Sequence, residues 1–201
     1  MLKVGLTGGL ACGKSFVGQA LADMGCHLLE ADQLGHEALL PGGAAYDDAI
    51  REFGPAIVGS DGRIDRKALA ALVFRRPERL AVLNSFVHPA VFRQEVEWLA
   101  RVHAADPQAI AVVEAAILIE TGSYRSFDKL IVVTCREEQQ VERALARDGA
   151  TREEVLGRLS RQMPLEQKRG FADFVIDASG AKEETLRQTR AVYESLRRIQ
   201  T

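Results

Sequence analysis

Eight consecutive residues near the start of the chain have the types and the spacing needed to hold a phosphate group. The run from Gly8 to Ser15 reads GGLACGKS and fits the pattern G-x-x-x-x-G-K-[ST] without a gap. Its glycines permit backbone conformations that aim successive N–H groups at phosphate oxygens. A helix that begins near Lys14 would add its positive end at the same place. The run therefore predicts a phosphate-binding loop, or P-loop.

Two side chains of this loop predict how a nucleotide would be held. Lys14 would reach the β- and γ-phosphates, and the Ser15 hydroxyl would ligate Mg²⁺. A glycine-rich turn with an incidental lysine is the alternative, but the run follows a strand-like segment and opens a helix-like one. We expect ATP·Mg²⁺ to contact the loop and the residue after it, that is Gly8, Gly9, Leu10, Ala11, Cys12, Gly13, Lys14, Ser15 and Phe16.

The loop alone does not distinguish a small kinase from a GTPase or a motor protein. The sequence contains no N-K-x-D-type guanine motif, and 201 residues leave no room for the further domains of a motor. The net charge is -2 and no long basic run occurs, so the electrostatic pattern of a duplex-binding protein is absent. We expect a kinase with a small-molecule acceptor and no nucleic-acid partner.

The length of the apolar runs and the number of cysteines indicate the cellular compartment of the protein. No apolar run is long enough for a signal-peptide core or a membrane span. The three cysteines form no CxxC pair and are too few for a disulfide framework, so we expect a cytoplasmic protein. Cys12 lies among the loop N–H groups beside Lys14, an environment that lowers the pKa of a thiol. We expect a reactive Cys12, with a passive replacement for Ala or Ser as the alternative.

Short apolar runs alternate with helical patterns along most of the chain. The expected strands are Leu2 to Leu6, His27 to Glu30, Ala109 to Val113, Lys129 to Val133 and Asp173 to Ile176. Helical spacing runs from Lys14 to Met24, which Gly25 would end, from Glu137 to Arg147 and from Lys182 to Ile199. The alternation predicts an α/β fold with a doubly wound, parallel, five-stranded sheet.

The stretch 32–105 has a different character. Turn sequences such as Pro41-Gly42-Gly43 and Phe53-Gly54-Pro55 separate helical periods, and we expect His88-Pro89 to stop one helix and restart the next. We interpret 32–105 as a helical insertion between strands, not an independent domain. A single domain would then have its core in 1–31, 106–147 and 169–201.

Asp32 and His36 follow the second expected strand, at the edge where ligands bind in open α/β sheets. Four residues apart, they share one helix face. Asp32 could accept a proton from an attacking hydroxyl, or could be only a helix N-cap. His36 could hydrogen-bond the acceptor, or could cap and pack. The residues alone leave both questions open.

The chain resembles the dephospho-coenzyme A kinase family over nearly its whole length. The run GLTGGLACGKS, followed by E-A-D-x-x-x-H, is similar to the family's GLTGGIGSGKS and D-A-D-x-x-x-H. Further elements match in order: Phe86-Val87-His88-Pro89, Ile117-Leu118-Ile119-Glu120, Gln140-x-x-Arg143-x-x-x-Arg147, Gln162, Lys168 and Ala172-Asp173-x-x-Ile176-Asp177. This ordered set is much more specific than the loop by itself.

The family phosphorylates the ribose 3′-hydroxyl of dephospho-CoA with ATP, the last step of coenzyme A synthesis. The resemblance implies that Asp32 is the general base, that the insertion holds the acceptor and that a helical lid spans 148–168. It also implies nucleotide contacts from Arg143 and Arg147, and acceptor contacts from His36, His88, Leu118, Glu120 and Arg161. Another nucleoside or nucleotide kinase of related fold is the alternative function. We expect a monomer, or at most a weak oligomer.

Structural roles are the alternatives for several of these residues. Arg143 and Arg147 could form a solvated face with glutamates as ion-pair partners. His88 could act only at the helix break. Glu114 ends a buried strand and could hold a Mg²⁺-bound water, since Mg²⁺ keeps several waters.

The chain departs from the family pattern at several positions. Ala11-Cys12 replace Gly-Ser, Phe16 replaces Thr, Glu30 replaces Asp, Ala116 replaces Pro, and Ala178 stands where Asn is frequent. Alanine tolerates fewer φ values than glycine, so we expect Ala11 to alter the loop conformation or the nucleotide affinity. The Asp, Lys and Ser positions expected to carry catalysis are kept.

Overall fold

The computed structural model describes residues 1–73, 76–148 and 151–200. Its contacts divide the chain into two compact units, one formed by Met1–Glu30 with Arg101–Thr201 and the other by Ala31–Ala100. The first unit contains the sheet and the phosphate-binding loop, and the second is mainly helical.

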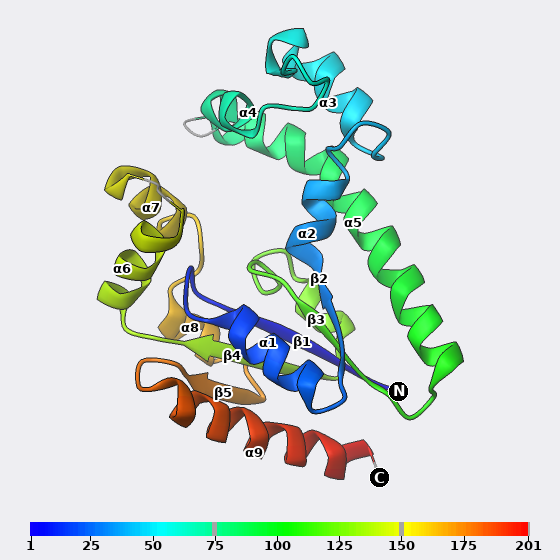
Figure 1. The fold of residues 1–201 in the computed structure, drawn as a ribbon, viewed down its shortest axis with the longest axis vertical. Helices are drawn as coiled ribbons and strands as arrows, with labels where there is room; N and C mark the ends of the chain where they lie inside the picture. Colours follow the sequence, from blue (N-terminus) through cyan, green and yellow to red (C-terminus); the bar gives the residue numbers. More distant parts are fainter. Residues whose placement is uncertain (74–75, 149–150, 201) are drawn as a thin grey trace. The chain divides into compact units, whose positions relative to one another are not determined.

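The first unit is built on five parallel strands in the order β2-β3-β1-β4-β5 (Figure 1). Their bounds are β1 Leu2–Gly8, β2 His27–Glu30, β3 Ile110–Glu114, β4 Lys129–Thr134 and β5 Phe174–Asp177. This arrangement confirms the predicted α/β class and the five parallel strands. The expected third and fifth strands began one residue too early, because apolar runs do not fix the exact residue at which pairing starts.

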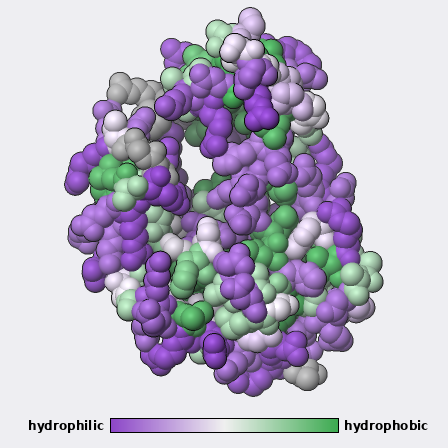
Figure 2. Space-filling model, in the orientation of Figure 1, coloured by the Kyte–Doolittle hydropathy of each residue, from purple (hydrophilic) through white to green (hydrophobic). Residues whose placement is uncertain are grey.

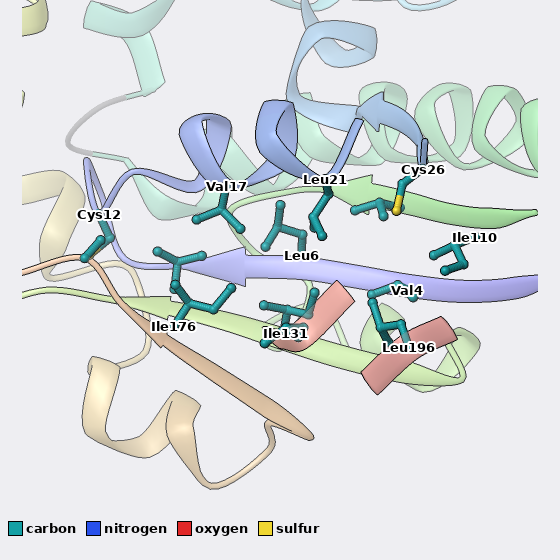
Figure 3. Packing of buried hydrophobic residues seen from close by; sticks show 14 of the residues in the cluster. Val4, Leu6, Cys12, Val17, Leu21, Cys26, Ile110, Ile131, Ile176 and Leu196 are labelled. Atoms are coloured by element: carbon teal, nitrogen blue, oxygen red, sulfur yellow. The ribbon is translucent and has the colours of Figure 1, made fainter. Parts of the chain in front are cut away.

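The core lies between the sheet and its covering helices. β3 is buried at every residue and β4 at all but the first, which is why both are continuous apolar runs in the sequence. Figure 3 shows Val17 and Leu21 of α1 (Lys14–Asp23) facing Leu6 of β1. Leu196 of α9 (Lys182–Gln200) belongs to the same cluster. Packing of both helices on one sheet holds the start of α1, and hence the end of the loop, in place.

Three helices lie between β4 and β5 in the sequence. They are α6 (Glu137–Asp148), α7 (Arg152–Leu159) and α8 (Leu165–Arg169), and a 3₁₀ turn, η2 (Ser123–Ser126), precedes β4. Val141, Ala144 and Val155 form a small apolar cluster between α6 and α7, and Leu10 of the phosphate-binding loop packs against it. The segment expected to be a lid is therefore helical and contacts the loop through this cluster.

The second unit is helical. It contains α2 (Ala31–Glu37), α3 (Tyr46–Phe53), a 3₁₀ turn, η1 (Pro55–Ile57), α4 (Arg66–Val73) and most of α5 (Pro77–Ala105). These elements share an apolar cluster of their own, with buried Ala49, Phe53, Ile57, Ile64, Leu69, Val73 and Leu83. A core of this kind explains how a stretch with frequent turn sequences holds several short helices together.

One sequence prediction about this unit is wrong. The helix does not stop at His88-Pro89, because α5 continues through Pro89 from Pro77 to Ala105. An internal proline costs a helix about 3 kcal/mol. Leu83 before Pro89 and Ala90 after it are both buried in apolar clusters, and burial of a leucine side chain contributes about 1.5–3 kcal/mol. Packing on both sides of the proline thus favours the continuous helix.

Figure 2 shows hydrophilic residues over most of the visible face, with hydrophobic residues in small separate groups. Among the described residues, no helix combines the length and the apolar character needed to cross a membrane.

Candidate active site

The phosphate-binding loop joins β1 to α1, as the sequence predicts, and its glycines are required by their surroundings. A Cβ atom on Gly8 would lie 2.2 Å from the carbonyl oxygen of Val133, so β1 and β4 approach too closely there for any other residue. Gly13, directly before α1, has φ 89, in the left-handed region that glycine adopts most readily. Both glycines that the motif requires, Gly8 and Gly13, therefore serve the backbone geometry of the loop.

Ala11 is the loop residue with a strained backbone. Its φ is 54, the only positive value at a non-glycine residue among 1–73, 76–148 and 151–200. The left-handed conformation costs an L-residue roughly 1–2 kcal/mol. The sequence prediction that alanine would be less suited than glycine here agrees with this geometry.

A cavity brings the loop together with two arginines from α6. It has a volume of about 190 Å³ and is lined by Ala11, Gly13, Lys14, Ser15, Phe16, Arg143 and Arg147. Arg143 Nη2 donates a hydrogen bond to the carbonyl oxygen of Ala178, at 2.9 Å. The two predicted phosphate-binding arginines, more than a hundred residues from the loop in sequence, thus face the same cavity as Lys14.

Ser15 and Glu114 form the part of the site that suits Mg²⁺. Ser15 Oγ donates a hydrogen bond of 2.9 Å to Oε1 of Glu114, which ends β3 and is buried. Within the described ranges, no three His, Cys, Asp or Glu side chains gather into a metal cluster. A hydroxyl and one carboxylate nevertheless fit Mg²⁺, which uses few protein ligands and otherwise water and phosphate oxygens.

The sequence predicts a lowered pKa for the Cys12 thiol, and this prediction is wrong. The Cys12 side chain is fully buried and points from the loop into the core (Figure 3). The Sγ atoms of Cys12 and Cys135 lie 2.9 Å apart, at hydrogen-bonding distance. This contact and burial raise the pKa of Cys12 far above its usual value, against the smaller opposing effect of Lys14. The inward direction of the side chain, which sequence does not reveal, decides the sign of the shift.

In the second unit, Asp32 and His36 both lie on α2. Asp32 is the second residue of the helix and therefore lies in its first turn, so it is not the N-cap itself. Arg66 Nη2 lies 2.9 Å from His36 Nε2. A guanidinium can only donate, so this nitrogen accepts and the ring proton is on Nδ1. Burial and then Arg66 lower the pKa of His36, while Asp32 opposes them more weakly.

The remaining predicted acceptor residues have differing environments. His88 on α5 and Arg161 after α7 are exposed, whereas Leu118 is only 3% exposed. Glu120 Oε1 accepts hydrogen bonds from the backbone N–H of Met163 and from Lys168, both at 2.9 Å. Glu120 Oε2 is buried and has no hydrogen-bond partner among the described residues. Contact of any of these residues with an acceptor stays a prediction.

Lys168 is a residue whose importance sequence reasoning missed. Its side chain is fully buried, and its ammonium contacts Gly8 at the start of the loop. In the sequence it appears only as one of several matches to the family pattern. A lysine that directly precedes an arginine in a short polar helix gives no local sign of burial, because the partners come from distant segments.

The fold and the site together define a P-loop kinase. The family model of dephospho-CoA kinase matches residues 2–184, so the chain belongs to the dephospho-CoA kinase family. The dephospho-CoA kinase of Aquifex aeolicus is 40% identical over 198 residues, covering 98% of this chain and 99% of that protein. The enzyme of the same name from Geobacter metallireducens is 40% identical over 194 residues, with 96% of each chain covered.

Solved structures support the fold. A Thermus thermophilus protein has 36% sequence identity and a TM-score of 0.80, with 96% of this chain and 97% of that chain covered. The Campylobacter jejuni dephospho-CoA kinase has 23% identity, a TM-score of 0.65 and 96% coverage of both chains, and supports the fold. Membership in this kinase family implies the use of ATP and a small-molecule acceptor.

Proposed function

We propose that this protein transfers the γ-phosphoryl group of ATP to the ribose 3′-hydroxyl of dephospho-CoA, giving coenzyme A and ADP. The observation that carries the proposal is the 40% identity to the Aquifex aeolicus enzyme over nearly the full length of both chains. The cavity that joins the loop to Arg143 and Arg147 supplies the chemistry that such a transfer needs.

The loop and the arginines would stabilise the transferring phosphoryl group. Negative charge is spread over its oxygens in a loose transition state, so catalysis depends mainly on positioning and on fixed positive charge. Lys14, Arg143 and Arg147 carry that charge and line one cavity. The N–H groups at the start of α1 add partial positive charge at the same place.

Ser15 and Glu114 would hold Mg²⁺, with the carboxylate acting through a bound water. When bound, the ion would neutralise negative charge on the phosphate groups of the nucleotide. The present hydrogen bond between the two side chains keeps the hydroxyl and the carboxylate oriented toward one another.

Asp32 would be the general base that receives the proton of the 3′-hydroxyl. Glu30, the last residue of β2, is paired with Glu114 of β3, and Glu114 contacts Ser15 of the loop. Asp32 follows the end of β2 by two residues in the sequence. A carboxylate there can both orient the hydroxyl and accept its proton.

The helical stretch 32–105 would hold the acceptor, and the segment 148–168 would act as a lid that excludes water. Of that segment, residues 149–150 lie outside the described residues. Within the acceptor site, we assign contacts to His36, His88, Glu120 and Arg161, with Leu118 as an apolar wall. A monomeric, cytoplasmic enzyme without a nucleic-acid partner is part of the same proposal.

A panel of acceptors tests this function. The purified protein is incubated with ATP and Mg²⁺ and, in parallel, with dephospho-CoA, AMP or UMP, and the products are identified by mass spectrometry. We expect coenzyme A and ADP to form in equal amounts, and little ADP to form without acceptor. Preferential phosphorylation of AMP or UMP would instead favour a nucleotide kinase of related fold.

A further inference from the structure

The ammonium of Lys168 is held by three segments that are far apart in sequence. It lies 3.2 Å from the carbonyl oxygen of Gly8, 3.0 Å from that of Ala116 and 2.9 Å from Oε1 of Glu120. An ammonium has three N–H donors, so these partners satisfy all of them. The side chain is fully buried, and α8 supplies it from a position just before β5.

Each partner of Lys168 belongs to a different part of the site. Gly8 is the first residue of the phosphate-binding loop, and Lys14 bonds the next carbonyl along, that of Gly9, at 3.1 Å. Ala116 follows Glu114 by two residues, and its carbonyl oxygen also accepts from Thr7 Oγ1. The single ammonium therefore connects the first residue of the loop to the segment just after β3, beyond the Leu6–Glu114 pair that ends the β1–β3 ladder.

The third partner extends the connection to the predicted lid. Glu120 Oε1 also accepts the backbone N–H of Met163, in the turn between α7 and α8. The end of the segment 148–168 is thus fixed to the same carboxylate as Lys168. These contacts all lie within the first unit.

Stability alone does not explain a charged residue at this position. Removal of an ammonium and a carboxylate from water costs several kcal/mol per ion, and well-packed apolar residues often stabilise such a place equally well. An apolar side chain cannot, however, hold two backbone carbonyls at fixed positions. The charge of Lys168 therefore holds the backbone at the base of the loop in a defined position.

We propose that Lys168 is a positioning residue for phosphoryl transfer: it fixes Gly8 and the segment after β3 relative to each other and connects both to the base of the lid. The proposal rests on the proposed kinase function. It predicts that loss of the ammonium misplaces the loop while the fold remains. Misplacement of reacting groups by about 1 Å typically costs on the order of 10²-fold in rate.

The test compares Glu120→Gln with Lys168→Met/Glu120→Gln. Lys168→Met alone leaves the Glu120 carboxylate buried without its cation, which can unfold the protein for a reason unrelated to catalysis. In the double variant neither ion is left without its counterion, so its melting temperature should be no lower than that of Glu120→Gln, in which the Lys168 ammonium has lost its anion. We expect kcat to fall by a further 30- to 100-fold, roughly, with a much smaller change in KM for dephospho-CoA.

Lys129→Met is the matched control, because Lys129 also forms an ion pair, with Asp173 at 2.8 Å, but at the opposite end of β4 from the loop. Its side chain is partly exposed, so we expect kcat to stay within about twofold. A double variant with the kcat of Glu120→Gln would overturn the positioning role. The positioning role would also be overturned if kcat rose together with the melting temperature from Lys168→Met to the double variant. That result would show that Lys168 acts only on stability.

Hydrogen exchange separates this proposal from the proposed function. Amides of residues 8–13 should exchange faster in the double variant than in Glu120→Gln, with or without ATP·Mg²⁺, and equally in Lys129→Met and wild type. This measurement does not depend on the acceptor, so it remains decisive if dephospho-CoA is not phosphorylated by wild type. Unchanged exchange in residues 8–13 would contradict the role of Lys168.

Discussion

Ser15 and Glu114 are hydrogen-bonded at 2.9 Å, although 99 positions separate them in the sequence. The bond joins the first turn of α1 to the last residue of β3, next to the central strand. It defines the place at which a hydroxyl, a carboxylate and the phosphate-binding loop meet.

Glu114→Gln tests the role of this carboxylate in Mg²⁺ binding. The amide keeps the size of the side chain but removes the charge that orders a metal-bound water. Loss of such an outer ligand usually weakens metal affinity by about 10- to 100-fold, so the Mg²⁺ concentration for half-maximal rate should rise by that factor. Titration of activity with Mg²⁺ measures this half-maximal concentration. Glu95→Gln, at another buried glutamate, is the control and should leave the Mg²⁺ titration unchanged.

Cys12 should resist alkylation in the native protein. Burial and the contact with Cys135 raise the pKa of Cys12, so the thiolate that reacts with iodoacetamide is scarce at neutral pH. Mass spectrometry of the labelled protein should show Cys12 modified much more slowly than in the denatured chain. Cys26, whose pKa burial raises to about 12, provides an internal reference. Rapid labelling of Cys12 that ATP prevents would restore the prediction made from sequence.

The protonation of His36 should depend on Arg66. Burial and Arg66 lower the pKa of His36, so an NMR titration should give a midpoint below about 6.5. Because the folded pKa is the lower one, His36 should cause stability to fall as the pH drops below about 6.5, where the unfolded chain takes up the proton first.

Arg66→Met removes the neighbouring positive charge and should move the His36 midpoint upward. Arg63→Met, on the same unit, is the control and should not move it. A midpoint that is the same in wild type and Arg66→Met would show that the 2.9 Å contact does not control the histidine.

Asp32→Asn distinguishes a general base from a residue that only stabilises α2. The amide keeps the shape but cannot take up a proton, so kcat should fall by roughly 10²- to 10⁴-fold. Nucleotide affinity should be nearly unchanged, and stability should change by no more than about 1 kcal/mol, the usual scale for an acidic side chain in a first helical turn. Asp47→Asn, in the first turn of α3, matches that helical position and should leave kcat intact. A wild-type kcat in Asp32→Asn with reduced stability would favour the helix role.

The sequence predicts most of the fold, because local patterns encode it. Continuous apolar runs placed β1 to β5 within a residue or two, and the loop motif located the turn from β1 to α1. The prediction failed at Pro89, where burial of Leu83 and Ala90 in separate clusters decides whether a helix continues. Such packing depends on residues distant in sequence, and local periodicity does not contain it.

The site was predictable only where a motif or a family pattern existed. The motif pointed to Lys14 and Ser15, and the resemblance pointed to Arg143 and Arg147; the four residues line one cavity, and their roles stay predictions. The direction of the Cys12 side chain and the burial of Lys168 were not predictable. Both follow from how β4, β3 and α8 come together around the loop, which no short stretch of sequence specifies.

The most direct test of the central claim is product formation from ATP and dephospho-CoA by wild type and Lys14→Ala. We predict that wild type yields coenzyme A, with the new phosphate located on the 3′-oxygen by NMR. Lys14→Ala removes a positive charge on the transferring group and should lower kcat by roughly 10²- to 10³-fold, with melting unchanged. Lys3→Ala, on the same strand-loop-helix segment but at the start of β1, is the control. Absence of 3′-phosphorylated product from wild type, or equal turnover by Lys14→Ala, would contradict the account.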